Sequence, residues 1–201
     1  LQKSNRYVVG ASDDKAAAAK KRREAKDYEV LTEIPFWRNG AGFTSGHRSR
    51  LYHFEGVDGR FTPLTSTTMD VSGFDISPDG SQLLITGQEF HDVYGYSDSV
   101  YLWQKQQQTW LMLPKTQELA VAAAAFCDDD TILLAASTRQ SFGLNENPEW
   151  FAYCIGSETL TQLTQDFDRT IDNRVGSECR LGGGDTLLTH GGEVFYITTQ
   201  G

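Results

Sequence analysis

The sequence predicts an all-β protein built from repeated sheets of four short antiparallel strands. Two observations lead to this prediction. A unit of strand, tight turn and strand recurs at a spacing of about 50 residues, and each copy is followed by a strand rich in aromatic residues. Four short strands in about 50 residues is the pattern of a β-propeller blade. The 201 residues therefore predict a propeller fragment of about 3.5 four-stranded antiparallel blades with one inserted helical or charged segment.

The clearest copy of the repeat is "VSGFDISPDGSQLLITG", residues 71–87. Its turn is Ser77-Pro78-Asp79-Gly80, in which proline presets one φ angle, aspartate can hydrogen-bond to the local backbone, and glycine accepts the left-handed position. Leu83-Leu84 follow in the second strand. Apolar runs on both sides of such a turn predict a β-hairpin.

Two further copies keep the spacing of the leucines. Leu133-Leu134 lie 50 residues beyond Leu83-Leu84, with Asp128, Asp129 and Asp130 in the turn, and Leu187-Leu188 lie another 54 residues on. The turn of the third copy would be Gly182-Gly183-Gly184-Asp185. The predicted third strands are 99–104, 150–155 and 193–198, and the predicted fourth strands are 109–113 and 159–164, with an earlier pair at 50–55 and 60–65.

This pattern predicts how the whole chain, 1–201, is divided as a partial propeller. We predict full blades at 66–118 and 119–170 and a partial blade at 171–201. An earlier partial blade would begin with the strand 6–11 and be interrupted by an insertion at 12–46, whose first half is rich in helix formers. A β-sandwich is the alternative, but a sandwich is not expected to repeat a turn–Leu–Leu unit at nearly constant spacing.

Composition narrows the range of functions. The net charge of -9 disfavours nucleic acid and anionic membranes as partners. The longest apolar run, 119–126, falls far short of the roughly 20 residues of a membrane-spanning helix. Three widely spaced cysteines indicate neither a disulfide framework nor a metal cluster, and no two histidines have ligand spacing. We expect a cytoplasmic protein with no cofactor and no metal.

The stretch "LLTHGGEVFYI" near the end of the chain allows two interpretations. His190-Gly191-Gly192 could supply backbone N–H groups to an oxyanion hole, or the two glycines could form the turn of a β-hairpin. "LLTH" aligns with the second strands of the earlier copies, and "EVFYIT" aligns with their aromatic third strands. We therefore predict a hairpin.

One segment outside the repeat joins aromatic side chains to guanidinium groups. It runs from 36 to 43 and includes Trp37 and Arg38, and Arg48 follows shortly after. Such groups could line a substrate channel or contact another domain. Trp37, Arg38 and Arg48 are therefore the candidate substrate or interdomain contacts, with packing between blades as the alternative.

The order of several motifs resembles the N-terminal propeller of the prolyl oligopeptidase family of serine peptidases, particularly its acylaminoacyl peptidase branch. The motifs are "PFWRNGAGF", "RSRLY", "FTPLT" and "VSGFDISPDG", and the resemblance covers residues 6 to about 90. It implies a propeller joined to an α/β-hydrolase domain that carries a Ser-Asp-His triad. The propeller would limit access to short peptides.

The residues of that hydrolase domain are not found in this sequence. No Gly-x-Ser-x-Gly nucleophile elbow is present, and "FTSGHRS" at 43–49 lacks the first glycine. We therefore expect no catalytic residues in the chain itself, and a hydrolase domain of the parent as its partner. The alternative is a stand-alone TolB-like propeller that acts as a binding or scaffold module, since such propellers share the "SPDG" turn. Exposed strand edges would also allow a homodimer.

Overall fold

The structure is a computed structural model that describes residues 3–6, 30–165, 167, 169–171 and 187–198. The chain divides into two compact units, residues 1–71 with 89–95 and residues 72–88 with 96–201. In the described ranges all regular structure is β except one three-residue 3-10 helix, η1 (Gly143–Asn145). No helix in those ranges is long and apolar enough to cross a membrane.

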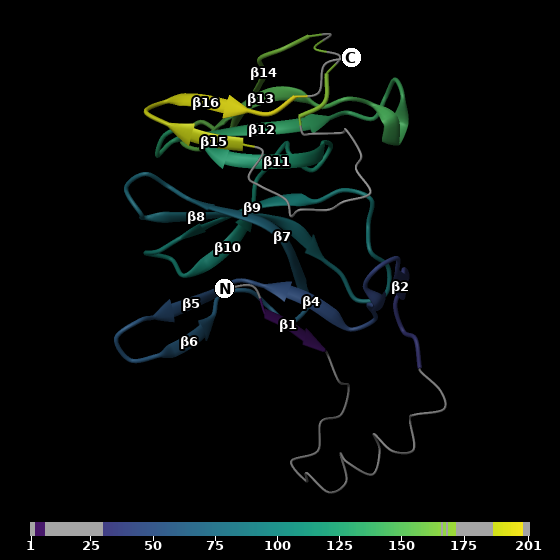
Figure 1. The fold of residues 1–201 in the computed structure, drawn as a ribbon. Coiled ribbons are helices and arrows are strands. Elements are labelled where there is room, and N and C mark those ends of the chain that lie inside the picture. The colour runs from purple at the N-terminus through teal and green to yellow at the C-terminus, as the bar shows by residue number, and fades with distance from the viewer. Residues whose placement is uncertain (1–2, 7–29, 166, 168, 172–186, 199–201) are drawn as a thin grey trace, which may run out of the picture. The chain divides into compact units, whose positions relative to one another are not determined.

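Two antiparallel sheets of four strands form most of the regular structure (Figure 1). The first has the order β10-β9-β8-β7 and the second has the order β11-β12-β13-β14, so strands that follow one another in the chain are neighbours in the sheet. The strands of the first sheet are β7 (Met69–Ile76), β8 (Gln82–Glu89), β9 (Ser99–Gln104) and β10 (Thr109–Met112). Those of the second are β11 (Ala120–Phe126), β12 (Thr131–Ser137), β13 (Glu149–Cys154) and β14 (Thr159–Gln162). These sheets confirm the predicted all-β fold of four-stranded sheets.

The turns of the two sheets use the same chemistry despite different sequences. Asp79 accepts hydrogen bonds from Ser81 N at 2.8 Å and Ser77 Oγ at 2.7 Å, and these bonds lower its pKa to about 2. In the second sheet Asp128 accepts from the backbone N–H groups of Asp130 and Thr131 at 2.9 and 2.8 Å. An aspartate that organises its own turn is therefore the feature that the two copies share.

An apolar core joins the two sheets within the second unit. Leu84 and Leu134, 50 residues apart, are 1% and 0% exposed and lie at equivalent places in β8 and β12. Most of β12 is buried on both faces, as expected for a continuous apolar run covered from two sides. The core consists of Leu84, Val100, Leu102, Leu113, Leu119, Val121, Phe126, Ile132, Leu134, Ala136, Phe151 and Tyr153.

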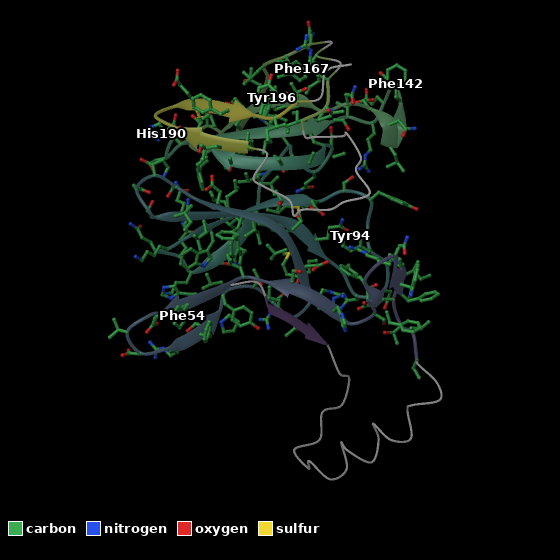
Figure 2. The ribbon with its side chains drawn as sticks, in the orientation of Figure 1. Phe54, Tyr94, Phe142, Phe167, His190 and Tyr196 are labelled. Carbon is green, nitrogen blue, oxygen red and sulfur yellow. The ribbon has the colours of Figure 1, made fainter. Side chains whose placement is uncertain are left out.

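The hairpin predicted at Gly191-Gly192 is confirmed. β15 (Leu187–His190) and β16 (Glu193–Tyr196) pair antiparallel, and the two glycines have φ angles of 59° and 78°. Leu187 and Val194 pack on the outer side of the second sheet, where the Tyr196 ring lies 5.2 Å from that of Trp150 (Figure 2). The third copy of the repeat thus continues as a hairpin against the second copy, while its predicted turn at 182–185 lies outside the described residues.

The loop between β12 and β13 is ordered by one carboxylate. Glu146 accepts hydrogen bonds from the backbone N–H groups of Thr138, Arg139, Ser141 and Phe142, at 2.9 to 3.3 Å. The bond from Ser141 contributes most to a lowered pKa of Glu146. The ring of Phe142, at the outer end of this loop (Figure 2), remains 74% exposed.

The first unit contains shorter strands. β1 (Lys3–Arg6) pairs with β4 (His47–Arg50), and β5 (Tyr52–Glu55) pairs with β6 (Arg60–Pro63). The predicted strand 50–55 is interrupted at Leu51, where the backbone bonds to Thr65 Oγ1 and Leu64 N instead of to a strand partner. The predicted strand 6–11, after its first residue, and the helix-forming half of the 12–46 insertion lie outside the described residues.

Candidate functional site

The segment that precedes β4 folds as a small hairpin. β2 (Trp37–Arg38) pairs with β3 (Gly42–Phe43), and the turn between them closes with a bond of 3.1 Å from Ala41 N to Arg38 O. Gly40 and Gly42 have φ angles of 79° and 74°, which non-glycine residues rarely adopt. The glycines of the "RNGAGF" motif are therefore required by the turn.

A second anchor fixes the start of this segment within the first unit. Ile34 forms a parallel bridge with Val93, in which Ile34 N donates to Asp92 O and Tyr94 N donates to Ile34 O, both at 2.8 Å. Residues 89–95 are thereby held beside the hairpin, although the bridged residues Ile34 and Val93 lie 59 positions apart in the sequence. This pairing brings Phe90 and Tyr94 to the site.

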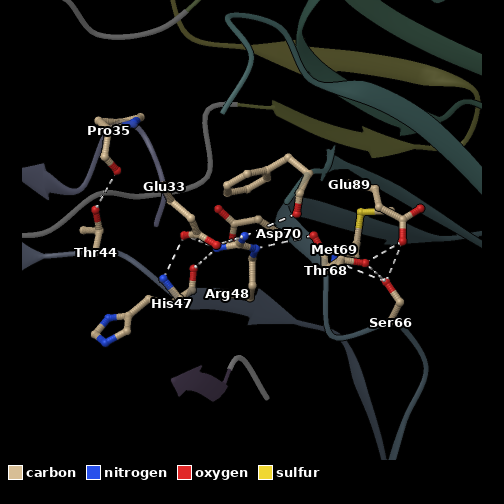
Figure 3. Close-up of polar contacts among 12 residues, drawn as sticks. Glu33, Pro35, Thr44, His47, Arg48, Ser66, Thr68, Met69, Asp70 and Glu89 are labelled. Atoms are coloured by element: carbon tan, nitrogen blue, oxygen red, sulfur yellow. Dashed lines mark hydrogen bonds and ion pairs between the residues drawn. The ribbon is translucent and has the colours of Figure 1, made fainter. Parts of the chain in front are cut away.

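Glu33 and Arg48 form a buried ion pair at the centre of the site (Figure 3). Arg48 Nη2 lies 2.6 Å from Glu33 Oε1 and Arg48 Nη1 lies 3.0 Å from Glu33 Oε2, and the residues are 4% and 8% exposed. Glu33 Oε2 also accepts from Gly46 N at 2.7 Å. Burial raises the pKa of Glu33, but the bonds from Arg48 and Gly46 and the charge of Arg48 outweigh it, so the pKa is lowered.

The guanidinium of Arg48 has no N–H group left for a ligand. Arginine carries five N–H donors. Besides the two bonds to Glu33, the guanidinium donates to the carbonyl oxygens of Thr68 at 3.4 Å, His47 at 2.9 Å and Phe90 at 3.3 Å. Arg48 was predicted as a substrate or interdomain contact, and its complete engagement makes it a residue that positions its neighbours.

Arg48 and Arg38 lie at the two ends of a stack, with two aromatic rings between them. The Arg48 guanidinium carbon lies 3.6 Å from the centroid of the Phe90 ring, and that ring meets Tyr94 edge-on at 5.0 Å. Arg38 lies over the other ring of the pair, 4.9 Å from the centroid of Tyr94. Both cation–aromatic distances fall within the range of attractive interaction. The buried ion pair therefore determines, through two rings, where the exposed Arg38 guanidinium is held.

Trp37, the third predicted residue, does not line the same space. Strand neighbours point to opposite faces, and of the two β2 residues only Arg38 lines the cavity. Trp37 is 51% exposed, as are the nearby Phe36 and Phe43 at 43% and 48%. The structure thus brings Arg38 and Arg48 together at one site and leaves Trp37 in an exposed apolar group.

This part of the first unit lines a cavity of about 180 Å³ that is partly open to solvent. Ser49 N donates to Asp70 Oδ1 at 2.7 Å on one wall, and Thr44 Oγ1 donates to Pro35 O at 3.3 Å on another. The lining consists of Glu33, Pro35, Arg38, Ala41, Thr44, His47, Arg48, Ser49, Asp70, Phe90 and Tyr94.

A polar network beside the ion pair fixes the backbone that Arg48 contacts. Glu89 Oε1 accepts from Ser66 Oγ at 2.9 Å and Thr68 Oγ1 at 2.7 Å (Figure 3). Thr68, whose hydroxyl bond is the largest influence, and Ser66 lower the pKa of Glu89. Phe90 N in turn donates to Thr68 O at 3.2 Å. The carbonyl groups around Arg48 are therefore held in place by their own bonds.

Sequence reasoning missed Glu33, Asp70, Phe90 and Tyr94. Glu33 directly precedes the apolar residues "IPFW". An acidic residue beside an apolar stretch can indicate a buried carboxylate with a charged partner, and this feature of the sequence could have identified Glu33. The other three belong to segments that the repeat assigned to a strand or a loop. No feature of their local sequence indicates that they meet the hairpin.

Comparison with known proteins shows a likeness of fold only. No protein-family profile matches the chain, and no curated protein matches it. Among solved structures, acylaminoacyl peptidase from Pyrococcus horikoshii is similar over 74% of this chain, with a TM-score of 0.51 and 16% identity. The four-stranded antiparallel sheets of this chain resemble propeller blades. TolB from Acinetobacter baumannii and a GH74 xyloglucanase from Xanthomonas campestris match 62% and 68% of the chain, with TM-scores of 0.45 and identities of 14% and 13%.

The match is a distant structural one to proteins that contain β-propellers. The chain spans only 23% of the peptidase, 29% of TolB and 21% of the xyloglucanase. At this identity the likeness establishes the fold and not the activity. The chain is a propeller-like β domain.

Proposed function

We propose that this chain is the non-catalytic propeller segment of a prolyl-oligopeptidase-like serine peptidase, most like an acylaminoacyl peptidase. It would gate the access of peptides to a hydrolase domain of the same protein. The observation that carries the proposal is the agreement of two kinds of likeness. The blade fold resembles that of the Pyrococcus horikoshii peptidase, and "PFWRNGAGF", "RSRLY" and "SPDG" occur here in the family's order.

The physical basis of gating is exclusion by size. Two sheets that share an interior of leucine, valine and aromatic side chains form a rigid wall, because such interiors are close-packed and change shape little. An entrance bounded by such a wall would admit an extended peptide and keep out a folded protein. Gating requires no catalytic group in the chain, in agreement with the absence of Gly-x-Ser-x-Gly from its sequence.

Exposed apolar side chains on ordered loops support a contact with another domain. Phe142 and Leu144, in the loop that Glu146 holds, are 74% and 67% exposed. Arg139 of this loop donates to Tyr96 O at 2.6 Å, and Tyr96 is itself 83% exposed. Exposed aromatic groups on a fixed loop are typical of interaction surfaces. We assign this edge of the second unit to the contact with the hydrolase domain.

The first test is the complete open reading frame that contains this chain. An α/β pattern with Gly-x-Ser-x-Gly beside the propeller is expected. A reading frame that holds only further blades would overturn the proposal and favour the stand-alone binding or scaffold propeller. Sedimentation of the purified chain tests whether exposed strand edges form a homodimer, since a monomer at micromolar concentration excludes that alternative.

The second test is enzymatic. The chain alone is expected to give no turnover of a chromogenic acyl-aminoacyl substrate, whereas the complete protein should cleave it and lose activity with a serine-directed inhibitor. In the complete protein, Phe142→Ser with Leu144→Ser should loosen the domain contact and raise cleavage of a long unfolded substrate relative to a tripeptide. Serine-dependent turnover by the chain alone would contradict the non-catalytic role.

A further inference from the structure

We propose that the cavity of the first unit binds the free carboxylate of an amino-acid-sized group, such as the C-terminal residue of a short peptide. This site belongs to the propeller chain itself. It does not depend on whether a hydrolase domain accompanies the chain, and it therefore goes beyond the gating role.

The contrast between the two guanidinium groups at the cavity identifies the one that can bind. All five N–H donors of Arg48 are engaged by groups of the chain. No hydrogen bond or ion pair joins the Arg38 guanidinium to the described residues, and the guanidinium lies against the Tyr94 ring. Arg38 therefore presents a planar fork of donors at the cavity, and this fork matches a carboxylate in two parallel bonds.

Arg38 is also held in place before any ligand arrives. Its guanidinium lies on Tyr94, which meets Phe90, which lies on the buried Arg48. Arg48 is in turn fixed by the ion pair with Glu33. A long flexible side chain ordinarily loses conformational entropy when it binds a ligand, and prior stacking reduces that cost. The stack converts an exposed arginine into a preorganised binding group.

The remaining lining determines which anion fits. Asp70 uses Oδ1 to accept from Ser49 N, and no other donor bonds to this carboxylate in the described part of the chain. A fixed negative group repels phosphate, which carries about 1.5 to 2 negative charges at neutral pH, more strongly than a singly charged carboxylate, and it offers an acceptor to an N–H group. A ligand with one carboxylate and a nearby N–H group satisfies both Arg38 and Asp70.

The size and character of the cavity limit the rest of the ligand. The cavity of about 180 Å³ is smaller than the roughly 300–1,000 Å³ of pockets that hold drug-sized molecules, and it suits one amino-acid residue. Pro35, Ala41 and the two rings supply apolar wall. A terminal residue with an aliphatic side chain therefore fits better than a charged one.

The test is titration calorimetry of the whole chain with glycyl-leucine, with glycyl-leucinamide as the uncharged control. Saturable binding of the acid is expected, and at least about tenfold weaker binding of the amide, because the amide lacks the charge that strengthens the bonds to Arg38. Equal binding of the two compounds would overturn the proposal. So would tighter binding of inorganic phosphate, or no binding of the dipeptide up to about 10 mM.

Matched variants separate the site from the net charge of the protein. Arg38→Met should weaken binding of glycyl-leucine about tenfold or more, and Arg38→Lys should fall between this variant and the wild type. Arg60→Met removes one exposed charge from the β5–β6 hairpin, where Arg60 pairs with Glu55, and should bind as the wild type does. Unchanged binding in Arg38→Met, with near-UV circular dichroism like that of the wild type, would exclude the site.

Discussion

Replacing Glu33 by Gln should strongly destabilise the first unit. The substitution preserves size but removes the charge opposite Arg48, whose side chain is only 4% exposed. It also places an amide NH₂ where a carboxylate oxygen accepted bonds from Arg48 and from Gly46 N. One result is a buried cation without a counter-ion, and the other is two donors that face each other.

The expected size of the effect follows from these contacts. Breaking a buried ion pair by removing one partner costs about 3–5 kcal/mol. Arg48 keeps three carbonyl acceptors and the Phe90 ring, so we expect about 3 kcal/mol, at the lower end. Glu33→Met with Arg48→Met removes both charges and fills the space with apolar atoms. This double variant should be more stable than the sum of the single changes predicts by about 2 kcal/mol.

Urea unfolding combined with hydrogen exchange of peptides that cover 33–50 measures the change locally. Local exchange is needed because the chain consists of two units that can open separately. The matched control is Glu55→Gln in the Glu55–Arg60 pair, whose partners are 32% and 66% exposed, and it should cost under about 1 kcal/mol. A loss under about 1 kcal/mol in Glu33→Gln, or additive effects in the double variant, would refute the reasoning.

The same pair gives the first unit a pH dependence. Because the folded-state pKa of Glu33 lies below its ordinary value, the carboxylate contributes stability that is fully present above the unfolded-state value, about 4.3. That contribution is lost as the pH falls through the lower folded-state pKa. Protection of 33–50 from exchange should therefore decline in acid, and it should decline less in Glu33→Gln, which has no such group to titrate.

Three further predictions concern the second unit and the hairpin. Glu146→Gln should raise the rate of hydrogen exchange in the loop 138–146. Acidification should do the same to the wild type as the pH falls through the lowered pKa of Glu146. An unchanged exchange rate would contradict the ordering of this loop by the Glu146 carboxylate. Asp75 in β7 accepts a bond of 2.8 Å from Phe126 N in β11 of the other sheet. Asp75→Ala removes this acceptor and should lower the free energy of unfolding in urea by about 1.5 kcal/mol. An unchanged free energy of unfolding would show that this bond does not stabilise the contact between the sheets. Gly192→Val imposes a β-branched residue at a φ angle of 78° and should lower stability by about 1–2 kcal/mol, whereas wild-type stability would speak against the observed turn geometry.

Much of the fold followed from local patterns. The Pro-Asp-Gly turn, the paired glycines at 191 and 192 and the recurrent leucines each have a short-range chemical reason to form a turn or a buried strand. The alanine-rich strand β11 shows the limit of propensity. Alanine is a poor strand former, yet these residues lie in a sheet because small side chains allow close packing against the neighbouring sheet. Repetition of the pattern, more than any single residue, indicated the architecture.

The candidate site was only partly visible in the sequence. The combination of aromatic and arginine residues at 36–48 drew attention to the correct segment, but three equal candidates emerged from it. Tertiary structure distinguishes them. All five N–H donors of Arg48 are engaged, most of them by groups far away in the sequence. The Arg38 guanidinium lies over the Tyr94 ring, and Trp37 does not line the cavity. The prediction that these residues contact substrate or another domain stays a prediction.

The sequence by itself determined the strands, the turns and their period, because these depend on residues that are close along the chain. It could not determine which charges meet. Glu33 lies 15 residues from Arg48, and Phe90 lies 42 residues from it. Their contact depends on the path by which the hairpin folds back beside residues 89–95. Only the tertiary structure makes one arginine part of the interior and leaves the other free to bind.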